Sequence, residues 1–287
     1  MQSRQYENKT KSLDFTKHVP SFQIIESLEK NVKERTQHPK YPFGLNQIDK
    51  LIWGFHKKEL LVIGARPSNG KTSFALQGAW NLGKLRFGVV FVSLEMGKEN
   101  IMERICCNEF SINGWKLRQG NLDEIKKFEE SVPKFNARAL SAKFEIIDYA
   151  GRTIKEIEEI IEFFKPEFLF IDHAQKITSV GYGNKYEALS DYVNRLQDLA
   201  IRNDCGIILN SQINRGGEFL KGSGDLEEAA DTLIYCNWKI KNSESCEDQK
   251  EFNIQVEKQR HGACDYSTIN FDAEYFRFSN REFWETK

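Results

Sequence analysis

The sequence ELLVIGARPSNGKTS, residues 59–73, decides the fold class of this 287-residue chain. Its first six residues are an apolar run that predicts a buried strand, and the helix-forming sequence NGKTSFALQGAWNLGK follows at residues 69–84. A Gly-containing loop that ends in Gly-Lys-Thr joins the two. In such a strand–loop–helix unit, the backbone N–H groups of the loop and the helix N-terminus point at an anion. The stretch therefore predicts a phosphate-binding loop in an α/β protein.

One residue of this loop departs from the general P-loop pattern, in which four residues separate a first glycine from Gly-Lys-Ser/Thr. Ala65 holds the place of that glycine. Lys71 is expected to reach the β- and γ-phosphates, and the Thr72 hydroxyl to bind Mg²⁺. On the tripeptide alone, a chance Gly-Lys-Thr remains an alternative. The residues expected to contact the nucleotide are Ala65, Arg66, Pro67, Ser68, Asn69, Gly70, Lys71, Thr72 and Ser73.

Composition and charge are those of an ordinary soluble protein, with 40% apolar residues, 29% charged residues and a net charge of −1. This charge gives no overall attraction for nucleic acid, so such binding must be local or must arise in an assembly. No apolar run approaches the ~20 residues of a membrane span, and the polar N-terminus lacks a signal-peptide core. The six cysteines have no metal-type spacing, which favours buried, reduced thiols. We expect a cytoplasmic protein that does not contact a membrane.

Apolar strands and helical segments alternate along the chain, which predicts a mostly parallel sheet with helices on both faces. The expected strands of this part are 59–64, 87–95, 144–149, 167–172 and 206–212. Three later segments are expected to extend the sheet as antiparallel strands, at 231–240, 251–259 and 267–278. Thr153 and Glu156 have the spacing of a capping box at the start of a helix. We expect one α/β domain over residues 41–287.

Residues 1–40 are expected to lie outside this domain, as a flexible leader followed by an amphipathic helix at about 21–36. The apolar stripe of that helix consists of Phe22, Ile25, Leu28 and Val32. Two prolines and a glycine in QHPKYPFG then break the helix. Such a helix could pack on its own domain or dock on a neighbouring subunit.

Three polar residues end expected strands, at the edge where open α/β sheets bind ligands. Asp172 ends the apolar run FLFID, where a P-loop ATPase places the acid that binds its metal. Glu95 ends the strand at 87–95, which we expect beside the strand at 59–64. Its carboxylate could polarise the water that attacks a γ-phosphate, although capping the next helix explains Glu95 alone equally well. Gln212 could hydrogen-bond the γ-phosphate or that water.

Six motifs follow one another in the order, and at comparable intervals, of the replicative hexameric helicases of the DnaB type. They are ARPSNGKTSFAL, VVFVSLEM, FLFIDHAQ, NSQINR, LKGSGDLEEAADTLIY and VEKQRHG. The resemblance covers residues 42–279 and implies a RecA-like P-loop ATPase that uses ATP and Mg²⁺. In that family the loop commonly reads Ala-Arg-Pro-Ser-x-Gly-Lys-Thr, so the resemblance accounts for Ala65.

The resemblance assigns roles to matching positions. Lys71 and Thr72 correspond to the phosphate and metal ligands, and Asp172 corresponds to the Walker B acid, which also holds the metal. Glu95 resembles the catalytic base. Gln212 resembles the residue that links the γ-phosphate to the DNA loops.

Two further matches concern neighbouring subunits and DNA. Lys258 and Arg260 match the catalytic basic pair that reaches into the next subunit's ATP site. The match to the loop that faces single-stranded DNA in the ring's channel consists of Lys221, Gly222, Ser223 and Gly224. Without the resemblance, the first pair reads as a solvated strand edge and the second stretch as a flexible turn.

The resemblance thus implies an ATP-driven translocase and helicase that acts on single-stranded DNA as a homo-hexameric ring, with a loader or other replisome protein as partner. Family members carry an N-terminal domain that recruits primase. No such domain fits before residue 42, so we do not extend primase recruitment to this chain. His173 stands where the family usually has Tyr, and His261 where it usually has Asn.

Two alternatives lack unwinding activity. The first is an ATP-dependent, ring-forming loading or regulatory module. The second is a recombination ATPase of the RecA or RadA type, which shares the P-loop but fits VSLEM and EKQRHG less well.

Overall fold

The computed structural model describes residues 20–33, 39–178, 181–183, 185–212, 228–238 and 250–281. The chain divides into two units, Met1–Gln37 and His38–Lys287. The predicted DNA-facing loop lies outside the described residues, at Lys221, Gly222, Ser223 and Gly224.

The first unit contains one described helix, α1 (Ser21–Lys33), which falls within the helix predicted at 21–36. Three residues of the predicted apolar stripe, Ile25, Leu28 and Val32, have exposed side chains. The side chain of Phe22 lies outside the described part of the chain. The first unit therefore buries none of these three side chains in a core of its own.

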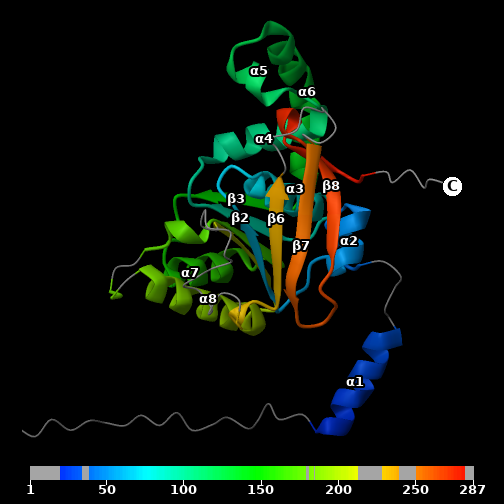
Figure 1. Cartoon of the computed structure of the whole chain (residues 1–287), viewed down its shortest axis with the longest axis vertical. Coiled ribbons are helices and arrows are strands. Elements are labelled where there is room, and N and C mark those ends of the chain that lie inside the picture. The colour runs from blue at the N-terminus through cyan, green and yellow to red at the C-terminus, as the bar shows by residue number, and fades with distance from the viewer. Residues whose placement is uncertain are drawn as a thin grey trace, which may run out of the picture. The chain divides into compact units, whose positions relative to one another are not determined.

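The described strands of the second unit form one sheet in the order β3-β2-β4-β5-β1-β6-β7-β8-β9. The strands are β1 (Leu60–Ala65), β2 (Val89–Ser93), β3 (Phe144–Asp148), β4 (Phe168–Asp172), β5 (Gly206–Gln212), β6 (Thr232–Trp238), β7 (Glu251–Gln259), β8 (Tyr266–Asp272) and β9 (Arg277–Ser279). Strands β1 to β6 are parallel, and β7, β8 and β9 continue the sheet in antiparallel fashion. Figure 1 shows β6, β7 and β8 side by side.

The C-terminal strands differ from the prediction in two places. The sequence predicts an antiparallel β6, but this strand pairs parallel with β1. Residues 213–231 supply the dozen or more residues that a parallel crossover needs, so β6 can start at the amino edge of the sheet. The segment predicted as one strand at 267–278 is the hairpin β8–β9, because Phe276 has a left-handed backbone (φ 52°) that reverses the chain.

The helices of the second unit cover both faces of the sheet, as predicted. They are α2 (Asn46–Ile52), α3 (Lys71–Lys84), α4 (Lys98–Phe110), α5 (Gly114–Arg118), α6 (Leu122–Ser141), α7 (Ile154–Phe164) and α8 (Lys185–Arg202), with short 3₁₀ segments η2 (Ala174–Lys176) and η4 (Ala273–Tyr275). Along β1, Ile63 packs into a cluster with α3, α4 and α6, whereas Leu60 and Val62 pack with α7 and α8. This alternation is the period-2 geometry of a strand buried on both faces. Figure 1 shows α7 and α8 side by side.

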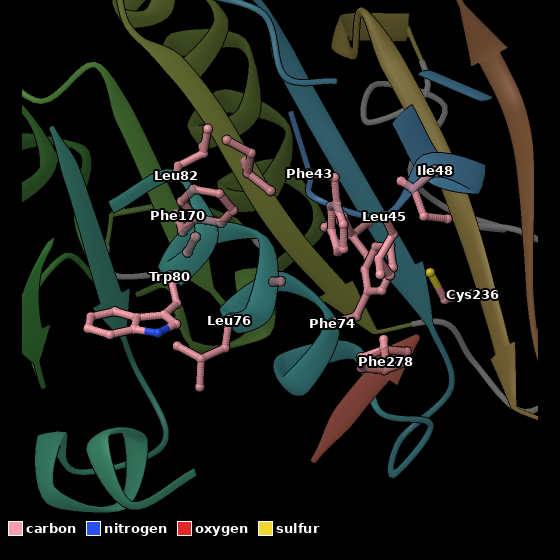
Figure 2. Close-up of a cluster of buried hydrophobic side chains, with 14 of the residues drawn as sticks. Phe43, Leu45, Ile48, Phe74, Leu76, Trp80, Leu82, Phe170, Cys236 and Phe278 are labelled. Carbon is pink, nitrogen blue, oxygen red and sulfur yellow. The ribbon is translucent and has the colours of Figure 1, made fainter. Parts of the chain in front are cut away.

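Aromatic rings support the first turn of α3. Phe74 stacks on Phe43 with ring centroids 4.5 Å apart, and Phe278 meets Phe74 edge-on at 5.4 Å. Figure 2 shows these three rings together in the buried cluster. Aromatic pairs of this kind stabilise beyond the area that they bury. The cluster therefore holds the turn that carries Lys71 and Thr72.

The thiols follow the prediction with one exception. Four described cysteines are buried, namely Cys106, Cys107, Cys205 and Cys236, and burial raises the pKa of Cys107 and of Cys205 to about 12. Cys264 is exposed instead, because it lies in the turn between β7 and β8, and Cys246 lies outside the described residues. In the part of the chain that the structure describes, no helix has the length and apolar character to cross a membrane.

The capping box at the start of α7 generates a test of the fold. The Thr153 hydroxyl accepts from the Glu156 N–H at 3.2 Å, and the Glu156 carboxylate accepts from the Thr153 N–H at 2.9 Å. We expect Thr153→Ala to lower the free energy of unfolding by about 1 kcal/mol, the typical contribution of an N-cap. Denaturant titration measures this change. Thr153→Ser keeps the hydroxyl and should retain most of the stability; an unchanged Ala variant would contradict the assignment.

Candidate active site

The loop after β1 has the backbone conformation that an anion cradle needs. Ser68 and Gly70 have positive φ angles of 62° and 72°, and Gly70 is the N-cap of α3. A Cβ atom at Gly70 would lie 3.0 Å from the Phe271 ring, so this left-handed position also lacks room for a side chain. The loop therefore turns its backbone and the N-terminus of α3 toward the same space, where an anion is favoured.

That space is a cleft of about 410 Å³, a size typical of small-molecule sites. The predicted residues that line it are Arg66, Pro67, Ser68, Asn69, Gly70, Lys71, Thr72, Ser73, Glu95 and Gln212. Ala65 does not line the cleft, because it is the last residue of β1 and its side chain is buried in the core. The structure thus brings together residues from three distant parts of the sequence.

Lys71 carries the main positive charge of the cleft. It is buried, and its Nζ has no hydrogen-bond partner among the residues that the structure describes. Burial lowers its pKa to about 8, although Asp172 and Glu95 oppose that shift. A buried ammonium without a partner is costly, and an oxygen anion would compensate it. The cleft therefore fits a phosphate at Lys71.

Asp172 joins the loop to the neighbouring strands. Its Oδ2 accepts from the Thr72 hydroxyl at 2.8 Å, and its Oδ1 accepts from Asn210 Nδ2 at 2.8 Å. Mg²⁺ prefers oxygen ligands and is commonly bound by one or two side chains together with substrate phosphates. The Thr72 hydroxyl and the Asp172 carboxylate therefore fit a Mg²⁺ that accompanies a nucleotide.

Glu95 reaches the cleft from a strand that is farther from β1 than predicted. Strands β4 and β5 lie between β2 and β1, because the α3 crossover passes over two strand positions that are filled later in the chain. The Leu94 N–H donates to the Asp172 carbonyl at 2.8 Å, which holds Glu95 near the acid. The half-exposed Glu95 carboxylate lies 3.1 Å from Nδ1 of the buried His173. Burial and the Lys71 charge lower the pKa of His173, which favours its neutral form.

Gln212 is tied to the segment that follows β4. Its backbone N–H donates to Gln175 Oε1 at 2.8 Å, and Gln175 Nε2 donates to the Ser211 hydroxyl and to the Gln212 carbonyl, both at 3.0 Å. Gln175 belongs to η2, just beyond Asp172. The end of β5 and the end of β4 therefore hold a fixed relation at the cleft.

Lys258 and Arg260 do not reach this cleft. They lie at the end of β7, where Gln259 pairs with Thr232 at the start of β6, and β6 runs parallel to β1. With ~3.3 Å per residue, the length of β1 separates this edge from the loop by roughly 17 Å. Arg260 instead forms an ion pair with Asp231 at 2.9 Å. The two basic residues are thus on the opposite edge of the sheet from the P-loop.

The family model of the DnaB-like helicase C-terminal domain matches residues 41–280. The chain belongs to this family. The predicted resemblance to the DnaB type is confirmed.

Two relatives are similar over most of this chain. The replicative DNA helicase DnaC of Bacillus subtilis (strain 168) is 30% identical over 258 residues, which are 84% of this chain and 56% of that protein. A probable plasmid replicative DNA helicase of Chlamydia trachomatis serovar L2 is 31% identical over 256 residues, which are 83% of this chain and 54% of that protein. The chain therefore spans a little over half the length of these curated relatives.

Two solved structures share the fold. The ATPase domain of another DnaB-like helicase superposes with a TM-score of 0.82 at 24% identity, covering 92% of this chain and 99% of that one. A DnaB-like replicative helicase, studied with its interactions with primase, superposes with a TM-score of 0.80 at 24% identity, covering 90% and 68%. The predicted RecA-like α/β fold is confirmed.

Two polar residues of this DnaB-like site escaped the sequence prediction. Asn210 is a buried amide within β5 that binds Asp172, and Arg104 of α4 lines the cleft. Each carries a signal in the sequence. Asn210 interrupts an apolar strand, and Arg104 lies three residues after the buried Ile101, on the same face of the helix.

Arg104 is a second cation of the cleft, and its Nε is buried with no hydrogen-bond partner within the described residues. Its guanidinium lies 5.1 Å from the Phe276 ring centroid. Burial, together with the nearby Arg118, lowers its pKa, so its charge is disfavoured in the absence of an anion. A bound phosphate would compensate that charge.

We expect Arg104→Met to weaken binding of a fluorescent nucleoside triphosphate about tenfold or more, because a hydrogen bond to a charged group contributes ~1.5–3 kcal/mol. Melting temperature should stay the same or rise, since replacing an uncompensated buried charge by an apolar side chain is often neutral or stabilising. Arg118→Met is the matched control, because Arg118 pairs with Glu103 outside the cleft. Unchanged triphosphate affinity would exclude Arg104 from the site.

Proposed function

We propose that this chain is an ATP-hydrolysing motor that moves along single-stranded DNA and unwinds duplex as a ring of identical subunits. One observation carries the proposal. A complete P-loop cleft and the basic pair Lys258 and Arg260 lie on opposite edges of one sheet. This arrangement suits a ring in which each ATP site lies between two subunits, because head-to-tail contacts bring unlike surfaces together.

Nucleotide binding rests on the residues of the cleft. The loop N–H groups and the N-terminus of α3 favour the phosphates, and the Lys71 ammonium, which has no partner among the described residues, supplies a full charge. The Thr72 hydroxyl and the Asp172 carboxylate would hold Mg²⁺, which supplies charge neutralisation at the phosphates when bound. The chain's own residues thus provide an anion cradle and a metal site side by side.

Hydrolysis then needs a group that orients and deprotonates water, and Glu95 is placed for this task. Its half-exposed carboxylate lines the same cleft as Lys71, and the contact with His173 restrains one oxygen. A carboxylate within reach of a water can act as general base. Gln212, held at the end of β5 by Gln175, is placed to respond to the phosphate and to pass the change along the chain toward residues 213–227.

Ring assembly explains the position of the basic pair. The Arg260 guanidinium is 43% exposed at its side chain, so it is accessible to a phosphate from outside its own subunit. An arginine supplied in trans typically contributes ~10³–10⁵ in rate. The exposed stripe on α1, with Ile25, Leu28 and Val32, suits docking on a neighbouring subunit. We assign residues 1–40 to a leader and linker helix on this ground.

DNA binding is proposed from family membership and from the Gly-rich stretch at 221–224, which lies outside the described residues. The relatives quoted above are named replicative DNA helicases. Six copies of one modest loop around a channel would give a basic, backbone-rich surface although the net charge of the chain is only −1. We place this activity in the cytoplasm.

Hydrolysis of ATP by the full chain, with and without a single-stranded oligonucleotide, tests the proposal together with Lys71→Ala. We expect hydrolysis that DNA stimulates, and a loss of at least about a hundredfold in Lys71→Ala, because an electrostatic group at a transferring phosphate contributes ~10²–10³. Thr153→Ala, far from the cleft, is the control. No hydrolysis under either condition would overturn the proposal, and hydrolysis without unwinding of a forked duplex would favour a loading or regulatory module.

A mixture of two inactive variants tests the shared site. Lys71→Ala subunits lack a working cleft, and Arg260→Ala subunits lack the group offered to the neighbour. In a mixed ring, some interfaces pair an intact cleft with an intact Arg260, so we expect part of the hydrolysis to return on mixing. Native mass spectrometry verifies that both variants enter one ring. Mixed rings that stay inactive would show that Arg260 does not act across the interface.

A further inference from the structure

Asp231 is a buried carboxylate at the edge of the sheet opposite the P-loop. Its Oδ2 accepts from the Leu60 N–H at 2.9 Å, and its Oδ1 pairs with Arg260 Nη1 at 2.9 Å. Gln197 Nε2 of α8 donates to Oδ1 at 3.5 Å. One side chain thus joins the first residue of β1, the end of β7 and helix α8.

Backbone hydrogen bonds surround the same carboxylate. The Asp231 N–H donates to the Leu60 carbonyl at 2.9 Å, and the Arg260 N–H donates to the Asp231 carbonyl at 2.9 Å. The Arg260 backbone and guanidinium are therefore both held by one residue. Since Asp231 is only 6% exposed, these contacts are shielded from competing water.

The Arg260 guanidinium has a second fixed contact, because its Nη2 donates to the Glu228 carbonyl at 3.1 Å. The same carbonyl accepts from Lys258 Nζ at 2.9 Å. A guanidinium carries five N–H donors in a planar fork, so donors remain for a further anion. The two contacts hold one part of the fork while the side chain stays 43% exposed.

We propose that Asp231 is a positioning residue that presents Arg260 to the phosphates of the adjacent subunit. A free arginine side chain samples many rotamers, whereas a planar fork held by a carboxylate loses less freedom when it binds. Because Asp231 also binds Leu60, the orientation of Arg260 is set relative to β1, the strand that carries the P-loop at its other end. Each subunit thereby couples the group that it offers to its neighbour to the strand of its own ATP site.

The inference rests on the proposed ring and its shared ATP sites, and it predicts an effect that only a route through Arg260 would produce. Asp231→Asn keeps an oxygen for the Leu60 N–H but removes the negative charge that holds the guanidinium. We expect kcat for ATP hydrolysis to fall about tenfold to a hundredfold, a part of the ~10³–10⁵ that an arginine in trans supplies. The dissociation constant for nucleotide should be unchanged, because the subunit's own cleft is intact.

The double variant separates positioning from a structural role. In an Arg260→Ala background, Asp231→Asn should have no further effect on kcat, since the group through which Asp231 acts is already absent. Asp49→Asn is the matched control: Asp49 is a buried carboxylate that accepts from the Phe43 and Gly44 N–H groups and pairs with no cation among the described residues. It should lower the melting temperature without lowering kcat.

Mixed rings keep the test decisive if Asp231→Asn alone is inactive. A folded Asp231→Asn subunit has an intact cleft, so mixing it with Lys71→Ala subunits should restore hydrolysis, as mixing Arg260→Ala does. Normal kcat in Asp231→Asn, or effects that multiply with those of Arg260→Ala, would overturn the inference. So would a failure of complementation by Asp231→Asn when Arg260→Ala complements. An Arg260→Ala protein with full activity would instead refute the shared site itself.

Discussion

The buried ammonium of Lys71 is the constraint on which the site depends. It has no hydrogen-bond partner among the described residues, and burial lowers its pKa to about 8. The fold nevertheless holds it there, because α3 starts at this residue and Phe74 anchors the first turn in the aromatic core. An anion cradle kept in this form costs stability in the free protein and returns it when phosphate binds.

The sheet gives this single charge its context. Asp172 ends β4 and binds both Thr72 and Asn210, so the acid, the loop and the next strand move as one unit. At the opposite edge, Asp231 binds the start of β1 and Arg260. Strand β1 therefore connects a phosphate cradle at one end to an exposed guanidinium at the other. A closed ring would place these two ends of successive subunits together.

Much of the fold could be predicted because local patterns agree with the tertiary structure. The apolar runs at residues 168–172 and 206–212 are buried strands, and the capping box of Thr153 and Glu156 starts α7 where expected. The direction of β6 could not be predicted, because parallel and antiparallel strands share the same side-chain period and differ only in the path of the connection. The predicted place of β2 in the sheet was wrong for a related reason, since strand order depends on elements that come later in the chain.

The sequence by itself determined the chemistry of the cleft. Gly70-Lys71-Thr72, Asp172 and Glu95 are identified by residue type and by their places at the ends of predicted elements. Only the tertiary structure decided which of these groups meet, and that Lys258 and Arg260 do not meet them. It also identified Asn210, Arg104 and Asp231, whose importance arises from partners 38 and 171 residues away, or from a buried nitrogen left without a partner among the described residues. Hydrogen bonds and buried charges between distant segments leave no periodic signal in a chain, because only folding brings their atoms together.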